Sequence, residues 1–268
     1  MTDPTRNLQE TALVTGATSG IGAELARLFA ADGVNLVLVA RDAERLAVYA
    51  EEIKARYAVE ATALAQDLSQ PGAAQQVHRA LQRAGIRVDY LVNNAGVGSH
   101  GDFAAVPLER QLSMMRLNME ALVGLSHCLL PDMLARKSGK LLNVASLAAY
   151  QPGGPGAAVY YASKAFVLSF SGGLSAELRH SGVSVTALCP GPVATRFQDA
   201  GGFAQTPLFN GPLVSRAEQV AKAGYLAMRR GQSVCVPGLV NKLLALGGRL
   251  PTRSIALLVN RLLLGGRR

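Results

Sequence analysis

A tyrosine and a lysine four residues apart, Tyr160 and Lys164, are the side chains of this sequence best suited to moving a proton. In a helix they would lie one turn apart on the same face. A phenol has an unperturbed pKa of about 10, so alone it is a poor acid or base at neutral pH. A fixed cation beside it stabilises the phenolate and lowers that pKa. Such a pair could exchange a proton near pH 7, as carbonyl reduction or alcohol oxidation requires, whereas most pairs at this spacing are ordinary solvated helix faces.

A glycine-rich stretch near the N-terminus could hold a phosphate group. Gly16, Gly20 and Gly22 form the pattern G-x-x-x-G-x-G between a strand-like stretch, 11–15, and a helix-like stretch, 23–31. Glycines let backbone N–H groups approach a pyrophosphate, and the start of a helix adds partial positive charge there. In this context the pattern predicts a dinucleotide site, and a simple tight turn is the alternative.

The end of the next predicted strand bears on which dinucleotide would bind. Dinucleotide folds often carry an acid there, which bonds the ribose 2′-hydroxyl. Here Ala40 occupies that position and Arg41 follows it. An arginine suits a 2′-phosphate through charge-assisted, bidentate hydrogen bonds, so the sequence favours NADP(H) over NAD(H). In the alternative, Arg41 is a solvated loop cation and Asp42 takes the role of the acid.

Strand-like and helix-like stretches alternate along the chain. Asp42 is a plausible N-cap, and Ser215 with Glu218 forms a capping box at the start of a later helix. The expected strands are 11–15, 34–40, 59–65, 88–92, 140–145, 183–188 and 233–236, and the expected helices are 23–31, 42–57, 70–84, 108–134, 159–180 and one from Ser215. This alternation predicts an α/β domain with a doubly wound, mostly parallel sheet and helices on both faces. Ligands of such sheets bind beyond the carboxyl ends of the strands, where the motifs fall.

The segment after the last predicted strand has a different composition. We divide the chain into a dinucleotide-binding and catalytic domain, residues 1–238, and an amphipathic, basic helical extension, residues 239–268. Two short helices are expected in the extension, over 239–246 and 255–264. Their apolar faces could pack on the domain, on another subunit or on a membrane surface, and packing on protein is the preferred interpretation. The irregular stretch 201–212 lies where a lid over the site would lie.

Charge, histidines and cysteines narrow the function classes. The net charge is +9, and the part of the chain from Gly238 onward holds six basic residues and no acidic ones. The preceding body is nearly balanced and lacks a basic stripe interleaved with aromatic residues, which argues against nucleic acid as a partner. The four histidines lack metal-ligand spacing, so no metal is expected. Three widely spaced cysteines and the lack of a signal-peptide pattern indicate free thiols in a reducing, cytoplasmic compartment.

Five motifs together resemble the short-chain dehydrogenase/reductase family, whose members are NAD(P)-dependent oxidoreductases with a Rossmann fold. The resemblance covers roughly residues 10–236, with the pieces in the family's order and spacing. The motifs are Thr15-Gly16-Ala-Thr-Ser-Gly20-Ile-Gly22, Asn93-Asn94-Ala95-Gly96, Ser146, Tyr160-x-x-x-Lys164 and Pro190-Gly191.

The resemblance implies roles for individual residues. Tyr160 would donate or accept the proton, and Lys164 would lower its pKa while bonding the nicotinamide ribose. Ser146 would hydrogen-bond the substrate oxygen, and Asn118 would hold a water molecule in a proton relay; as alternatives, Ser146 could be only a cap and Asn118 could serve only the helix backbone. The implied cofactor-binding residues are Gly16, Thr18, Ser19, Gly20, Ile21, Gly22, Arg41, Asp67, Leu68, Asn93, Asn94, Ala95, Gly96, Tyr160, Lys164, Pro190, Gly191, Val193 and Thr195.

The expected activity is that of an NADP(H)-dependent carbonyl reductase or alcohol dehydrogenase. Its substrate would be a ketone, an aldehyde or a secondary alcohol, and an apolar lining by Phe103, Leu147, Phe197 and Phe203 suggests a hydrophobic one. The resemblance also implies a homodimer or homotetramer. The alternative function is a catalytically silent NADP(H)-binding sensor. The basic extension could in addition hold the protein on anionic membranes.

Overall fold

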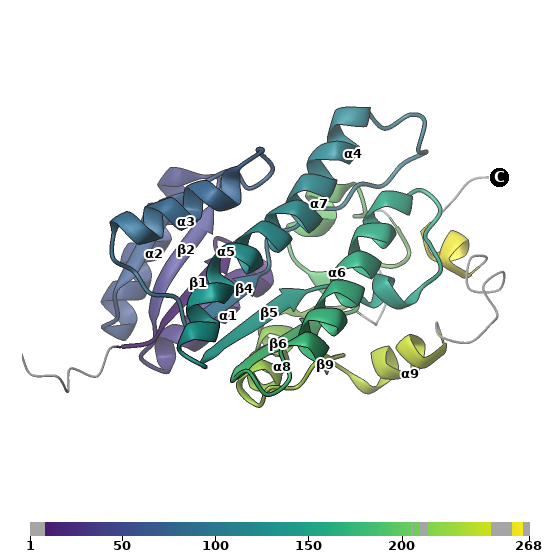
Figure 1. Cartoon of the computed structure of the whole chain (residues 1–268). Helices are drawn as coiled ribbons and strands as arrows, with labels where there is room; N and C mark the ends of the chain where they lie inside the picture. The colour runs from purple at the N-terminus through teal and green to yellow at the C-terminus, as the bar shows by residue number, and fades with distance from the viewer. Residues whose placement is uncertain (1–8, 205, 210–213, 248–258, 265–268) are drawn as a thin grey trace, which may run out of the picture.

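A sheet of parallel strands forms the centre of the computed structural model (Figure 1). The structure describes residues 9–204, 206–209, 214–247 and 259–264. Within these residues the sheet has seven strands in the order β3-β2-β1-β4-β5-β6-β9, all paired in parallel. The strands are β1 Thr11–Thr15, β2 Asn35–Ala40, β3 Ala61–Ala65, β4 Tyr90–Asn93, β5 Gly139–Val144, β6 Val183–Leu188 and β9 Val234–Cys235. The strand order reverses between β1 and β4, so the predicted doubly wound Rossmann fold is confirmed.

Helices cover both faces of the sheet because the strands are apolar on both sides. Ala12 and Val14 of β1 face one cluster of buried residues, and Leu13 between them faces another, as the alternation of a strand requires. The first cluster packs under α1 Gly20–Ala31, α2 Ala43–Tyr57 and α8 Ala217–Arg229. The second packs under α3 Ala73–Arg83 and α5 Ala121–Ala135, with the end of α6 Ala158–Glu177.

The long helix expected over 108–134 is divided into three parts. It consists of α4 Leu108–Met115, a π-helical turn η1 Arg116–Glu120, and α5. Asn118 lies in the middle of the π-helical turn. Single π-helical turns within α-helices are frequent at functional sites, and the hydrophobic periodicity of the sequence carries no sign of the extra residue.

Two predictions of helix caps have different outcomes. Asp42 caps α2, since its carboxylate accepts a hydrogen bond from the backbone N–H of Arg45 at 3.0 Å. The capping box at Ser215 is wrong. Ser215 is extended, because β8 Ser215–Arg216 pairs in parallel with β7 Val193–Ala194, and no side chain caps α8.

The predicted short helix after the sheet is present as α9 Leu239–Gly247, and residues 259–263 form a helical turn (Figure 1). The expected helix over 255–264 thus lies partly outside the described residues. Asn241, Ala245 and Leu264 are buried, while most other apolar side chains of these segments are exposed. No helix within the described ranges is long and apolar enough to cross a membrane.

The glycine-rich turn between β1 and α1 is closed by a hydrogen-bonded asparagine. Asn94 donates through Nδ2 to the carbonyl oxygens of Thr15 at 2.8 Å and Gly16 at 3.3 Å. A Cβ atom added to Gly22 would lie 2.4 Å from both the Gly16 oxygen and Asn94 Nδ2. Gly16 and Gly20 have positive φ angles of 64° and 54°, which residues with a Cβ rarely adopt. The turn therefore requires glycine for both space and backbone conformation.

We expect Gly22→Ala to lower the free energy of unfolding by roughly 1–3 kcal/mol, because the added methyl overlaps a backbone oxygen in a packed turn. Gly172→Ala is the matched control. Gly172 is exposed on α6, an added Cβ there meets nothing within 4 Å, and alanine should stabilise that helix by about 0.5–1 kcal/mol. Urea denaturation followed by circular dichroism measures both variants. Equal unfolding midpoints for the two would contradict the steric argument.

Candidate active site

A single cavity of about 930 Å³ connects the glycine-rich turn with Tyr160 and with the C-terminal segments. It lies at the carboxyl ends of the strands, where the loops after β1, β2, β4, β5 and β6 meet. The predicted residues that line it are Gly16, Thr18, Ser19, Gly20, Ile21, Arg41, Leu68, Asn94, Ala95, Gly96, Ser146, Tyr160, Lys164, Pro190, Gly191, Val193 and Thr195. Of the other predicted residues, all of them within the described ranges, Gly22, Asp67, Asn93 and Asn118 do not line it. The structure thus gathers most of the predicted set around one cavity.

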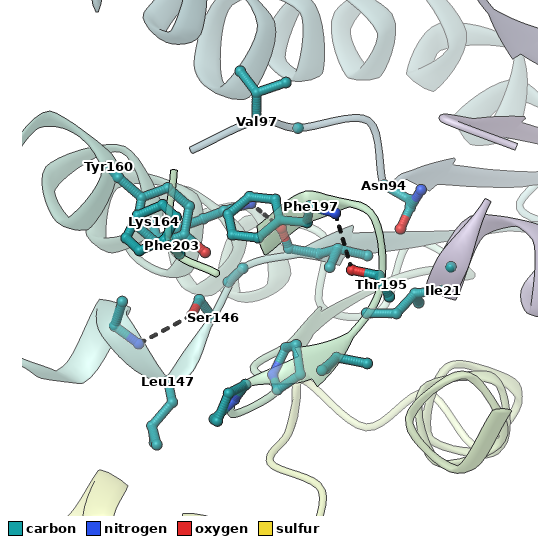
Figure 2. Close-up of a pocket in the computed structure, with 18 of the residues that line it drawn as sticks. Ile21, Asn94, Val97, Ser146, Leu147, Tyr160, Lys164, Thr195, Phe197 and Phe203 are labelled. Atoms are coloured by element: carbon teal, nitrogen blue, oxygen red, sulfur yellow. Dashed lines mark hydrogen bonds between the residues drawn. The ribbon is translucent and has the colours of Figure 1, made fainter. Parts of the chain in front are cut away.

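Tyr160 and Ser146 face each other across this cavity (Figure 2). Tyr160 lies in the first turn of α6, and Ser146 follows β5 at the start of the short helix η2 Leu147–Tyr150. The Ser146 oxygen accepts a hydrogen bond from the backbone N–H of Ala148 at 3.1 Å, so it is a cap as well as a cavity residue. Burial raises the pKa of Tyr160 to about 12, and the hydrogen bond with Ser146 acts in the opposite direction. The phenol is therefore protonated at neutral pH.

Lys164 lies behind the tyrosine ring and points into the sheet. Its Nζ donates to the carbonyl oxygen of Val144 at 2.8 Å and lies 6.0 Å from the centroid of the Tyr160 ring. Burial lowers the pKa of Lys164 to about 8, while the nearby Cys189 acts to raise it. This arrangement does not match the expectation that Lys164 lowers the pKa of Tyr160. Burial of the phenol dominates, because the ammonium is directed at the Val144 carbonyl rather than at the phenol oxygen.

Asn118 is a buried bracing residue in this structure. Its Oδ1 accepts a hydrogen bond from the backbone N–H of Val97 at 3.0 Å, and its Nδ2 donates to the Val97 oxygen and to Ser163 Oγ, both at 3.0 Å. Ser163 belongs to α6, so Asn118 ties the loop after β4 to the helix of Tyr160. This accounts for its position outside the cavity lining, and its role in a proton relay stays a prediction.

The two asparagines at the end of β4, Asn93 and Asn94, have different roles. Asn94 lines the cavity and closes the glycine-rich turn. Asn93 is buried behind it, with Nδ2 donating to Asn143 Oδ1 at 2.9 Å and to Ser126 Oγ at 3.2 Å. The side chain of Asn93 points into the interior and braces the sheet, and its contact with a cofactor stays a prediction.

Two arginines lie at the end of the cavity beside β2. Arg41 lines it as expected, and so does Arg45, which the sequence reasoning missed. Arg45 donates through Nη2 to the carbonyl oxygen of Thr18 at 2.8 Å, so it also ties α2 to the glycine-rich turn. One feature of the sequence points to Arg45: it follows Arg41 by four residues, across the start of a helix capped by Asp42, which can bring the two cations together. A pair of cations at this point can bind a phosphate group.

Asp67 is an anchor for the loop after β3. Its carboxylate accepts hydrogen bonds from Ser69 N at 2.9 Å, Ser69 Oγ at 2.7 Å and Gln70 Nε2 at 3.3 Å. Burial acts to raise its pKa, but these hydrogen bonds and the charge of Arg41 outweigh burial and hold the pKa below its usual value. The expected contact of Asp67 with a cofactor is therefore not supported by the cavity lining, whereas Leu68 next to it does line the cavity.

Aromatic rings form an apolar wall beside Tyr160 (Figure 2). The ring centroid of Tyr160 lies 5.4 Å from that of Phe197 and 5.9 Å from that of Phe203, and those two phenylalanines are stacked. Phe197 opens the short helix α7 Phe197–Gly201. Leu147 also lines the cavity. The expectation for Phe103 is wrong, because its side chain is 64 % exposed and outside the cavity lining.

The C-terminal segments complete the cavity, which the sequence reasoning did not anticipate. Residues of α9 and of the turn at 259–264 belong to the lining: Asn241, Leu243, Leu244, Gly247, Val259, Asn260 and Leu263. The family resemblance ends near residue 236, before this segment. The only sign in the sequence that the segment packs against the domain is its apolar residues at helical spacing.

Comparisons with known proteins agree with this geometry. The model of the short chain dehydrogenase family matches residues 10–202. Sulfoacetaldehyde reductase 2 of Chromohalobacter salexigens is 39 % identical over 192 residues, which cover 71 % of this chain and 75 % of that protein.

Solved structures extend the similarity to the whole fold. A short-chain dehydrogenase from Sphingobium yanoikuyae in complex with NADPH superposes with a TM-score of 0.80 at 34 % identity, covering 89 % of this chain and 92 % of that one. The bulky-bulky ketone specific alcohol dehydrogenase from Comamonas testosteroni has a TM-score of 0.75 at 29 % identity, covering 97 % and 95 %. The chain therefore belongs to the short-chain dehydrogenase/reductase family of oxidoreductases.

Proposed function

We propose that the protein is an NADP(H)-dependent carbonyl reductase. The observation that carries the proposal is the half-buried phenol of Tyr160 beside the hydroxyl of Ser146, in a cavity that begins at a glycine-rich turn. NADPH, when bound, supplies a hydride to the carbonyl carbon. Ser146 then stabilises the charge that develops on the substrate oxygen, and Tyr160 gives its proton to that oxygen. A phenol with a raised pKa keeps its proton until an alkoxide forms.

The substrate class follows from the wall beside Tyr160. Phe197, Phe203 and Leu147 offer apolar surface and no charge to the group attached to the carbonyl. An apolar ketone or aldehyde fits this wall better than a charged one, because these three side chains offer no partner to a charge that loses its hydration. One solved relative is named for bulky ketones, in line with this proposal.

The nicotinamide dinucleotide would lie between the glycine-rich turn and Lys164. Backbone N–H groups at the start of α1 would hold its pyrophosphate. Lys164 Nζ lies 3.4 Å from the position of a Cβ at Gly96, within reach of a ribose hydroxyl on that side of the cavity. Asp42 caps α2, and Arg41 and Arg45 line the cavity beside it, which supports NADP(H) over NAD(H). The relative from Sphingobium yanoikuyae was solved with NADPH.

Substituting the two adjacent tyrosines tests the catalytic role. We expect Tyr160→Phe to lower kcat for ketone reduction by about 10²- to 10⁴-fold while the affinity for NADPH changes little, since only the proton donor is lost. Tyr161→Phe is the matched control, and its kcat should stay near that of the unaltered protein. Initial rates of NADPH oxidation and fluorescence titration with NADPH give the two readouts. Near-full activity of Tyr160→Phe would refute the assignment.

Removing the cation at the end of β2 tests the choice of dinucleotide. Arg41→Ala should raise KM for NADPH by about 10- to 100-fold and leave KM for NADH nearly unchanged, because a charge-assisted hydrogen bond to the 2′-phosphate is lost. Arg56→Ala, at the exposed far end of α2, is the control for general electrostatic attraction. If the two variants behave alike, the arginine does not select the dinucleotide.

A catalytically silent NADP(H) sensor is the second candidate. It would need the glycine-rich turn but not the set of Ser146, Tyr160 and Lys164, all of which line one cavity here. Tight binding of NADPH without oxidation by any of a panel of ketones and aldehydes would favour the sensor.

We also propose a cytoplasmic homodimer or homotetramer in which residues 239–268 form an extension to the domain of residues 1–238. The stacked rings of Phe166, which is exposed, and Phe170, which is half-buried, lie on α6 and support association with another subunit. Peripheral contact with anionic membranes is supported by the exposed leucines of α9, Leu239, Leu243 and Leu246, and by the six cations after Gly238.

Vesicle sedimentation tests the membrane contact. The protein should sediment with phosphatidylserine-containing vesicles at low salt and be released at high salt, because salt screens its cations from the anionic headgroups. Leu239→Ser/Leu246→Ser, which removes two exposed apolar side chains, should sediment less. Equal sedimentation of both proteins, or sedimentation that salt does not change, would rule the contact out.

A further inference from the structure

The helical turn at residues 259–264 is fixed to the substrate end of the cavity by polar and apolar contacts. Asn260 is 5 % exposed and donates through Nδ2 to the carbonyl oxygen of Gly153 at 2.6 Å. The backbone N–H of Leu208 donates to the carbonyl oxygen of Leu263 at 3.2 Å. The turn is therefore bonded both to the loop before α6 and to the segment after α7.

The same turn enters the apolar cluster around the catalytic tyrosine. Leu264 is 1 % exposed and shares this cluster with Tyr161 and Phe203, against which Tyr160 packs. Leu263 next to it lines the cavity, as does Val259 one turn earlier. An apolar surface thus runs from the phenol of Tyr160 to the C-terminal turn.

Helix α9 brings a second group of apolar side chains to this cavity. Leu243 and Leu244 line it, and Asn241 anchors the start of the helix by donating to the carbonyl oxygen of Pro237 at 2.8 Å. A Cβ at Gly191, in the loop after β6, would lie 2.6 Å from Asn241 Oδ1, so the helix is packed closely on that loop.

We propose that α9 and the turn at 259–264 form the binding wall for the apolar chain of the substrate, with Leu263 and Leu243 as specificity-determining residues. This inference rests on the proposed carbonyl reductase function and names its substrate class: ketones or aldehydes with an extended apolar chain. Asn260 lines the cavity and holds the turn through Gly153, so we assign it a positioning role for Leu263.

A series of straight-chain methyl ketones of increasing length tests the wall. Each CH₂ group that is buried should raise kcat/KM by about 3- to 4-fold until the wall is filled. Leu263→Trp fills this part of the cavity, so it should abolish the rise of kcat/KM with chain length. Leu262→Trp is the matched control, because Leu262 is 69 % exposed and outside the cavity lining, and it should behave like the unaltered protein.

A second pair on α9 keeps the test independent of the stability of the turn. Leu243 and Leu246 are both 62 % exposed, but only Leu243 lines the cavity. Leu243→Trp should shorten the range of accepted ketones, and Leu246→Trp should not. Asn260→Leu, which keeps the side-chain size but removes the donor, should raise KM for long ketones by a larger factor than KM for the shortest one.

The outcomes separate the wall from the reaction itself. If short and long ketones are reduced equally well by the unaltered protein, or if Leu263→Trp and Leu243→Trp keep its chain-length profile, the wall is refuted and the reductase function stands. If NADPH binds but is not oxidised by any ketone of the series, the proposed reductase function is refuted, and the proposed binding wall is refuted with it.

Discussion

The structure depends on a junction of hydrogen bonds between β1 and β4, the two strands at which the sheet order reverses. Thr15 Oγ1 donates to the carbonyl oxygen of Val92 at 3.1 Å and accepts from the backbone N–H groups of Asn94 and Ala95, both at 2.9 Å. Asn94 returns two hydrogen bonds to the glycine-rich turn. The turn and the loop after β4 are thereby held as one unit. The parts of the cavity that these two segments line are therefore fixed relative to each other.

A second set of buried polar contacts fixes α6, the helix that carries Tyr160, against this junction. Asn143 of β5 accepts from Asn93 and donates to Ser171 Oγ of α6 at 2.9 Å, and Lys164 of the same helix donates to Val144. Asn118 adds a third tie through Ser163. Each of these groups is buried and would cost free energy if left unpaired, which fixes the helix in one position. The position of Tyr160 is therefore set by the polar interior behind it rather than by the apolar wall in front.

Much of the fold and most of the candidate site can be predicted from the sequence, because the local sequence patterns of these regions agree with the geometry of the folded sheet. Apolar runs of strand length separated by helical stretches predict a parallel sheet, and such a sheet brings its loops to one edge. Residues whose environment depends on distant contacts could not be placed this way. Asn93 and Asn94 are identical in type and adjacent, yet one points into the interior and the other into the cavity. Ser215 has the spacing of a cap, but pairing with Val193 keeps it extended. The wall formed by Leu243 and Leu263 depends on contacts with loops far away in the sequence.

The contact of Asn260 with Gly153 spans 107 residues, and this separation has a consequence for how the protein folds. Contacts between distant parts of a chain form slowly, because a long loop must close before they contribute. The hydrogen bonds of the β1–β4 junction involve no residue after Ala95, so they can form before residues 239–264 are available for packing. The substrate pocket is then the last part of the molecule to assemble, and a newly made chain holds a folded dinucleotide site before it has a closed pocket.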